Sequence, residues 1–293
     1  MKVWSIIKKI FFCIFVAHIC WFLIFIYRTF PDRDLAIIDL KEKIIIYLAV
    51  FVAVLLLYYF LLRKIKVLRK IVSILTEIFF ISYIATMFYL LWGMVFNPPV
   101  TFTQIGSLLE GNGLKKENIA YNKMGSNIKL AVISSEDQLF PDHDGFDIKA
   151  IKLAMKYNKR HPGKLRGAST ISQQVAKNVF LWQGRSQLRK GLEVFFTFNI
   201  EHFWTKKAIL ERYLNVAEMG KGIFGVQAAA QTYFNKDAKD LTRMEAAMIA
   251  ASLPNPKVYT VKPVSAYVSE KAANILRQMN NLEGDPDIDD LVK

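Results

Sequence analysis

The chain contains 293 residues, of which 53% are hydrophobic, and it carries a formal net charge of +14. This composition and a mean hydropathy of +0.23 argue against a purely soluble or a disordered protein. The two cysteines, Cys13 and Cys20, both lie in one apolar stretch near the amino terminus. The rest of the chain therefore has no cysteine with which to build a disulfide framework or a cysteine-based zinc site.

Three apolar runs occupy the first third of the sequence, at residues 10–27, 44–62 and 71–96. A helix needs about 20 residues to cross the hydrocarbon core of a bilayer. We therefore expect a membrane region over residues 1–96 with about three transmembrane helices. No small-residue cleavage site precedes Arg28, so the first run is interpreted as an uncleaved anchor and not as a secretory signal.

The charges between these runs predict how the membrane region is oriented. Residues 63–70 carry five cations and no anion, whereas cations and anions balance over residues 28–43. Positively charged loops stay on the cytoplasmic side, so an odd number of spans places residues 97–293 on the outer face. Glu77 lies inside the third run, where a carboxylate is costly unless it is paired, and a helix–helix contact or a shorter span is the favoured interpretation.

Helical periodicity dominates the sequence from Leu130 onward, and alternating strand patterns are scarce. Asp147 is placed to cap one helix, and a second is expected to start at Ser186. Thr242 and Glu245 fit a capping box at the start of a third. The sequence therefore predicts a mainly α fold for the part of the chain that follows the membrane region.

We expect four parts in the chain. The membrane region, residues 1–96, is followed by a connecting segment over residues 97–129, to which no regular structure is assigned. A helical domain covers residues 130–280. An acidic tail over residues 281–293 is expected to be solvated and frayed.

The densest polar segment of the sequence begins at Glu136, two serines after the apolar run at residues 130–133. A carboxylate that emerges from such a run is partly desolvated, which raises its pKa towards that of a useful general base. Glu136 is therefore a candidate catalytic residue, with an ordinary helix-surface or capping carboxylate as the alternative. His143 stands among aspartates, but the spacing matches no strong metal signature, so a structural, hydrogen-bonded histidine is favoured.

A basic segment rich in hydroxyl and amide groups follows. Residues 149–166 contain seven cations and no anion. The expected start of the next helix is suited to binding anions, and its candidate donors are Ser169, Thr170, Gln173 and Gln174. Four more cations come after it: Lys177, Arg185, Arg189 and Lys190. Each cation alone is explained by a solvated helix face or by lipid headgroups, but together they indicate a phosphate-bearing partner.

Glu193 lies four residues after Arg189, so the two side chains share one face of the expected helix. An ordinary ion pair within the helix is one interpretation. The flanking Phe195 and Phe196 indicate that part of this helix is buried, which makes a second carboxylate of the site the other interpretation. The residues alone leave both open.

Several motifs in one order carry a resemblance to a known family. They are Glu136-Asp137…Phe140…His143…Gly145, then Gly167-Ala168-Ser169-Thr170-Ile171-Ser172-Gln173-Gln174, then Arg189-Lys190…Glu193, then Lys206…Ile209-Leu210-Glu211-Arg212-Tyr213-Leu214-Asn215, and finally Pro254-Asn255-Pro256. From about Leu130 to Gln278 the chain resembles the peptidoglycan glycosyltransferases of family 51, closest to the monofunctional biosynthetic type.

The resemblance implies a lysozyme-like, mostly helical domain that polymerises lipid II. The donor is the growing glycan on undecaprenyl pyrophosphate, and the acceptor is the next lipid II. Glu136 is implied to deprotonate the acceptor 4-hydroxyl, which attacks the donor anomeric carbon with inversion to form a β-1,4 bond. Glu193 is implied to orient the cations or the donor, while the cations and neutral donors named above stabilise the departing pyrophosphate. A divalent cation assisting the pyrophosphate is compatible with the family, but no sequence signal requires a cofactor.

The resemblance also implies a place in the bacterial cytoplasmic (inner) membrane, with the catalytic domain on the periplasmic face. The expected partners are lipid II, the growing lipid-linked glycan and the membrane, with cell-wall synthesis or division proteins as further candidates and no nucleic acid. Monofunctional members usually carry one span, whereas this chain offers three. Two alternatives stay open, a lysozyme-like peptidoglycan hydrolase and a non-catalytic membrane scaffold.

Overall fold

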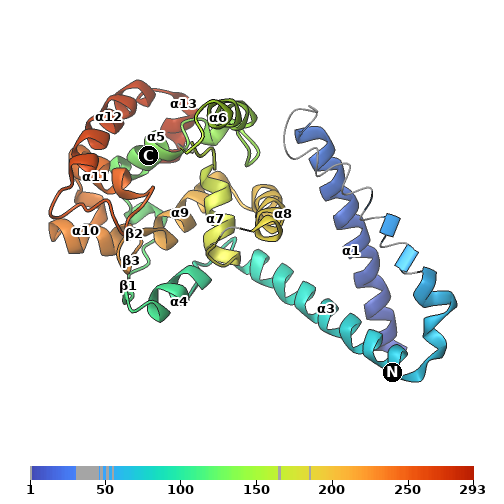
Figure 1. Ribbon diagram of the computed structural model, residues 1–293. Coiled ribbons are helices and arrows are strands. Elements are labelled where there is room, and N and C mark those ends of the chain that lie inside the picture. The colour runs from blue at the N-terminus through green and yellow to red at the C-terminus, as the bar shows by residue number, and fades with distance from the viewer. Residues whose placement is uncertain are drawn as a thin grey trace. The chain divides into compact units, whose positions relative to one another are not determined.

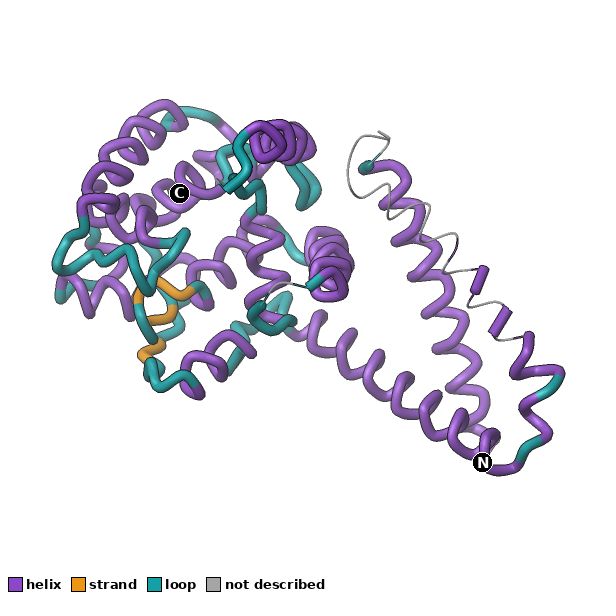
Figure 2. The backbone as a smooth tube through the Cα atoms, in the orientation of Figure 1, coloured by secondary structure: helices purple, strands orange, loops and turns teal. Residues whose placement is uncertain are grey.

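The computed structural model describes residues 2–30, 46, 49–50, 53–54, 56–163, 166–184 and 186–293. It divides into two compact units, Met1–Leu90 and Leu91–Lys293, and helices dominate both of them (Figures 1 and 2). Much of the predicted second span lies outside the described residues, so that span stays a prediction.

The membrane unit contains two long helices, α1 (Lys2–Thr29) and α3 (Lys66–Trp92). Among the described residues, these two are long and apolar enough to cross a membrane. Lys8 of α1 and Glu77 of α3 form an ion pair, which confirms the helix–helix contact predicted for Glu77. The ring of Phe15 adds an edge-on contact to the Phe79 ring, with centroids 5.1 Å apart.

The connecting segment, residues 97–129, contains regular structure that the sequence analysis did not predict. Helix α4 (Phe102–Leu109) starts at a capping box, in which Thr101 and Gln104 each accept a hydrogen bond from the other's backbone amide. A short strand, β1 (Lys115–Lys116), follows it. The pattern Thr-x-x-Gln is a known signal for the start of a helix. The mixed polarity of the segment made this signal easy to overlook.

Helix α5 (Ser126–Glu136) is the central element of the second unit, and its residues 128–134 are buried on every side. It packs against α11 (Arg243–Ser252), α12 (Ala266–Leu282) and α13 (Pro286–Val292). A helix that is covered all round belongs in a core. Glu136, its last residue, is therefore the point at which the chain leaves that core.

A second group of helices packs beside this core. Helix α7 (Ile171–Phe180) contacts both α8 (Gln187–Phe203) and α9 (Lys206–Val216). Helices α6 (Ile148–Arg160) and α10 (Val226–Phe234) complete the set.

A sheet of three very short strands accompanies these helices, in the order β1-β3-β2. The strands β2 (Glu218–Gly220) and β3 (Ile223–Phe224) are antiparallel, and β1 runs parallel to β3. Figure 2 shows how little of the domain these strands occupy, so the domain is mainly α, as predicted.

The carboxyl-terminal tail is not frayed, and this expectation was wrong. Asp285 caps α13 through the amides of residues 287 and 288. Ile288, Leu291 and Val292 are each 5% exposed or less, and α13 packs on α5. Their spacing of three and four residues forms an apolar stripe, which the neighbouring aspartates concealed.

Candidate active site

Glu136 occupies a half-buried position at the carboxyl end of α5. Its Oε2 accepts a hydrogen bond from Gln174 Nε2 at 2.8 Å, and its Oε1 accepts one from Ser135 Oγ at 3.3 Å. Burial raises the pKa of Glu136 above its usual value, while these two hydrogen bonds oppose the rise. A carboxylate with a raised pKa is a better proton acceptor than a solvated one.

The residue after Glu136 connects two helices. Asp137 accepts hydrogen bonds from the Ile171 amide at 2.9 Å and from His143 Nε2 at 3.0 Å. His143 Nδ1 in turn accepts from the Gly145 amide at 3.1 Å. His143 is therefore the structural, hydrogen-bonded histidine that the sequence favoured, and it helps to hold the end of α5 against the start of α7.

Gly145 is required by the close approach of this loop to α8. Its φ is +86°, and a Cβ added there would lie 2.7 Å from Thr197 Cγ2 and 2.8 Å from Glu201 Cγ. The Gly145 carbonyl also accepts from Thr170 Oγ1 at 2.7 Å. The loop thus fixes the start of α7, and with it Gln174, the partner of Glu136.

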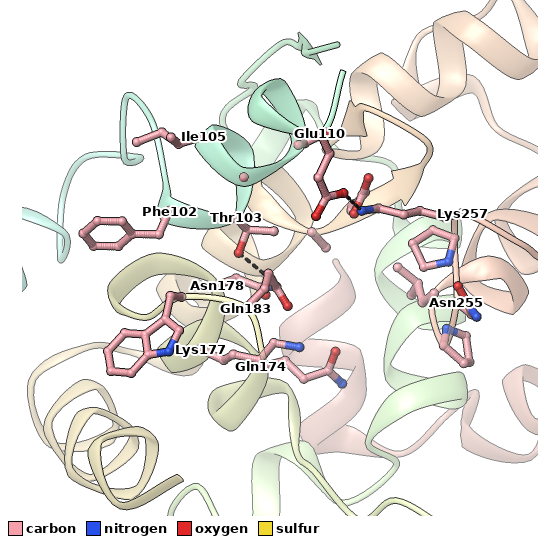
Figure 3. A pocket seen from close by; sticks show the side chains of 18 of the residues that line it. Phe102, Thr103, Ile105, Glu110, Gln174, Lys177, Asn178, Gln183, Asn255 and Lys257 are labelled. Atoms are coloured by element: carbon pink, nitrogen blue, oxygen red, sulfur yellow. Dashed lines mark hydrogen bonds and ion pairs between the residues drawn. The ribbon is translucent and has the colours of Figure 1, made fainter. Parts of the chain in front are cut away.

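Two cavities meet beside Glu136 and Gln174. The first, which we name the carboxylate cavity, has a volume of about 850 Å³ and is lined by Glu136 and residues 166–170. The second, which we name the lysine cavity, has a volume of about 610 Å³ and is lined by Lys177 and α4 (Figure 3). Gln174 and Pro254 line both. Two binding spaces therefore adjoin at Gln174, the hydrogen-bond partner of Glu136, and Glu136 itself lines one of them.

Lys177 is a half-buried cation that lines the lysine cavity. Burial lowers its pKa, and the nearby charge of Glu193 raises it again. Glu193 is 3% exposed, and its two oxygens accept from Arg189 Nη1 at 2.8 Å and Lys190 Nζ at 2.5 Å. Three cations and one carboxylate therefore act on one another electrostatically along α7 and α8.

The structure gives the candidate residues different positions. Ser169, Thr170 and Gln174 line the carboxylate cavity. Gln173 is buried, and its Oε1 accepts from the Thr170 amide in a capping box, so it lines neither of these two cavities. Arg185 lies outside the described residues.

Sequence reasoning missed three residues around Glu136. The Tyr213 hydroxyl on α9 donates to Gln174 Oε1 at 3.2 Å. Tyr267 and Lys271 on α12 line the carboxylate cavity. Tyr213 was part of a quoted motif but had no role, and α12 lies too far along the chain for spacing to connect it with Glu136.

Within the described part of the chain, no three His, Cys, Asp or Glu side chains form a group that could hold a metal ion.

A carboxylate that lines one cavity, beside an adjoining cavity lined by a cation of the charged cluster, is the arrangement expected of a group-transfer enzyme. The family model described as Transglycosylase matches residues 103–280, so the chain belongs to this family and is a glycosyltransferase. This confirms the family and the fold class predicted from the motifs. The match includes α4 and β1, upstream of Leu130.

Curated relatives extend this result. The chain is 50% identical over 194 residues to proteins named biosynthetic peptidoglycan transglycosylase in Escherichia coli O157:H7 and in Shigella boydii serotype 4. These alignments cover 65% of this chain and 80% of each relative. With the two apolar helices α1 and α3, the family indicates a membrane-associated enzyme.

Proposed function

We propose that the protein is a peptidoglycan glycosyltransferase that polymerises lipid II into β-1,4 glycan strands and releases undecaprenyl pyrophosphate. The observation that carries the proposal is the Glu136–Gln174 pair at the junction of the two cavities. The names of the curated relatives support peptidoglycan as the product.

In the proposed reaction the acceptor sugar occupies the carboxylate cavity and the donor occupies the lysine cavity. Glu136 takes the proton from the acceptor 4-hydroxyl as the oxygen bonds to the donor anomeric carbon. The bond from that carbon to the pyrophosphate oxygen breaks on the opposite face, and its electron pair leaves with the pyrophosphate. The configuration at the carbon therefore inverts.

The cationic cluster has its role at the leaving group. Negative charge accumulates on the pyrophosphate as the bond breaks, and fixed positive groups lower the barrier by stabilising it. Lys177 lines the donor cavity, with Arg189 and Lys190 held near it on Glu193. Since both oxygens of Glu193 already accept from cations, we assign it to orienting this cluster and not to proton transfer.

The surface of α4 supports a site at the bilayer. Thr103, Gln104 and Ser107 face the domain and are buried, whereas Phe102 and Leu109 are 58% and 84% exposed. The helix thus turns its apolar side outward, the reverse of a soluble amphipathic helix. It follows the candidate span α3 after only nine residues. We propose that this face contacts the outer leaflet of the cytoplasmic membrane, where lipid-linked substrates reside.

Supplying purified protein with lipid II tests the function against its rivals. Growth of glycan chains supports the transferase, whereas shortening of sacculus glycan without growth supports a hydrolase. Loss of both activities supports a scaffold. A reporter fused after Lys293 tests the topology, and it is expected to be active only outside the cytoplasm. Cell-wall synthesis or division proteins stay predictions as partners.

A further inference from the structure

Helix α12 forms one wall of the carboxylate cavity. Tyr267 and Lys271 are four residues apart, so they share one face of the helix, and both line the cavity with Glu136. A different face of α12 carries Val268 and Ala272, which are buried, and α12 packs on α11 and α5. Both side chains are therefore presented by a packed helix, which positions groups more precisely than a loop.

The Tyr267 ring is held by a second aromatic ring. Tyr259 stacks on it, with centroids 3.8 Å apart and an angle of 17° between the planes. Tyr259 belongs to a tight turn, in which its backbone amide donates a hydrogen bond to the Asn255 carbonyl at 2.8 Å. Tyr267 nevertheless keeps 38% of its surface exposed. The pair thus presents a preformed aromatic surface at the edge of the cavity.

Lys271 supplies positive charge to the same cavity. Within the part of the chain that the structure describes, its ammonium makes no ion pair or hydrogen bond. Burial raises the pKa of Glu136, and the charge of Lys271 lowers it. Burial also raises the pKa of Tyr267, with the charge of Glu136 adding to the rise. Glu136 is therefore close enough to interact electrostatically with both Lys271 and Tyr267.

We propose that Tyr267 and Lys271 form the acceptor-recognition wall of the enzyme, with the Tyr267 ring covering the apolar face of an acceptor pyranose and Lys271 pairing with an anionic group of the same acceptor. The inference rests on the proposed function, because that function assigns the acceptor to the carboxylate cavity. Both residues determine binding and positioning, and neither takes part in proton transfer.

The chemistry of the two side chains matches this substrate class. The C–H groups of a pyranose form an apolar face, and an aromatic ring with its large, rigid surface is suited to cover it. A lysine ammonium is a flexible point charge with three donors, which suits a phosphate or a carboxylate. A sugar that bears an anionic group therefore satisfies both residues at once.

The test uses the full-length protein in detergent with two substrates. A labelled lipid II whose 4-hydroxyl is blocked acts only as a donor, and unmodified lipid II is varied as the acceptor. Tyr267→Ala is expected to raise the acceptor KM by about three- to tenfold, the loss of one aromatic contact, without change in kcat or donor KM. Tyr267→Phe keeps the ring and is expected to behave as the wild type.

The second arm replaces the cation. Lys271→Ala is expected to raise the acceptor KM and to move the acidic limb of the pH–rate profile to higher pH, since a charge that favours ionised Glu136 is lost. Lys271→Arg is expected to restore both. Arg277→Ala removes an exposed cation further along α12 and is the matched control.

The outcomes separate the inference from the function on which it rests. An unchanged acceptor KM in Tyr267→Ala, or an equal loss for donor and acceptor, overturns the inference while lipid II polymerisation by the wild type stands. A wild type that makes no product from lipid II contradicts the proposed function itself. Thermal melting identifies variants that unfold, and Tyr267→Leu, which keeps apolar bulk without a ring, then replaces Tyr267→Ala in the same comparison.

Discussion

The side-chain amide of Gln174 forms one hydrogen bond to Glu136 and another to Tyr213. Its Nε2 donates to Glu136 Oε2 at 2.8 Å, and its Oε1 accepts from the Tyr213 hydroxyl at 3.2 Å. Tyr213 is 1% exposed, so the orientation of the amide is set from the core of the domain. The carboxylate therefore presents a fixed geometry to the cavity junction.

Gln174→Ala is expected to lower kcat by about ten- to a hundredfold, the effect of losing one hydrogen bond to a charged group. The acidic limb of the pH–rate profile is expected to move to higher pH, because this hydrogen bond lowers the pKa of Glu136. Tyr213→Phe leaves the Gln174 amide in place and is expected to lower kcat by less than Gln174→Ala does. A profile that does not move in Gln174→Ala would show that Gln174 does not control the ionisation of Glu136.

Glu136→Gln is expected to melt at least as high as the wild type at pH 7. Burial raises the pKa of Glu136 above 4.5, so the folded state binds this proton more tightly than the unfolded state. Its contribution to stability is then fully present at low pH and is lost as the pH rises through the folded pKa. Melting curves across pH check this, and the advantage of the variant should shrink as the pH falls. A variant that melts well below the wild type at pH 7 would indicate a structural carboxylate.

Arg189→Ala is expected to weaken use of the donor more than it lowers the melting temperature. Arg189 is a partner of Glu193 at 2.8 Å, and its loss disturbs the charge cluster beside Lys177. Steady-state rates at varied donor concentration, compared with melting curves, check this. A loss confined to the melting temperature would favour the ordinary ion pair that the sequence left open for Glu193.

Leu108→Ser is expected to slow polymerisation in lipid vesicles while leaving the rate in detergent and the melting temperature unchanged. Leu108 on α4 is 49% exposed and lines neither of the two cavities, so the substitution removes apolar surface without opening a cavity in the core. Leu153→Ser on α6, where the side chain is 60% exposed, is the control. Equal rates for both variants in vesicles would mean that α4 does not contact the bilayer.

The residues that lie near one another in sequence were the best predicted. Glu136 was recognised because a polar segment follows an apolar run, and the helix beginning at Thr170 because hydroxyl and amide groups gather there. Gln173 and Gln174 could not be distinguished by type, and the structure uses one as a cap and the other as the partner of Glu136. The Thr-x-x-Gln pattern was the signal that separates them.

Contacts across long sequence separations could not be predicted in this way. Tyr267 reaches the Glu136 cavity because α12 packs on α5, and no local pattern specifies that packing. The prediction of a frayed tail was wrong for a related reason. The apolar stripe of α13 is stabilised only by packing on a surface that other parts of the chain form.

The measurement that most directly tests the central claim is glycan synthesis from purified lipid II by the full-length wild type and by Glu136→Gln, with folding checked by melting. The wild type is expected to form polymer and to release undecaprenyl pyrophosphate, whereas the folded variant is expected to form none. Polymerisation by Glu136→Gln at the wild-type rate would contradict the assignment of Glu136 as the base.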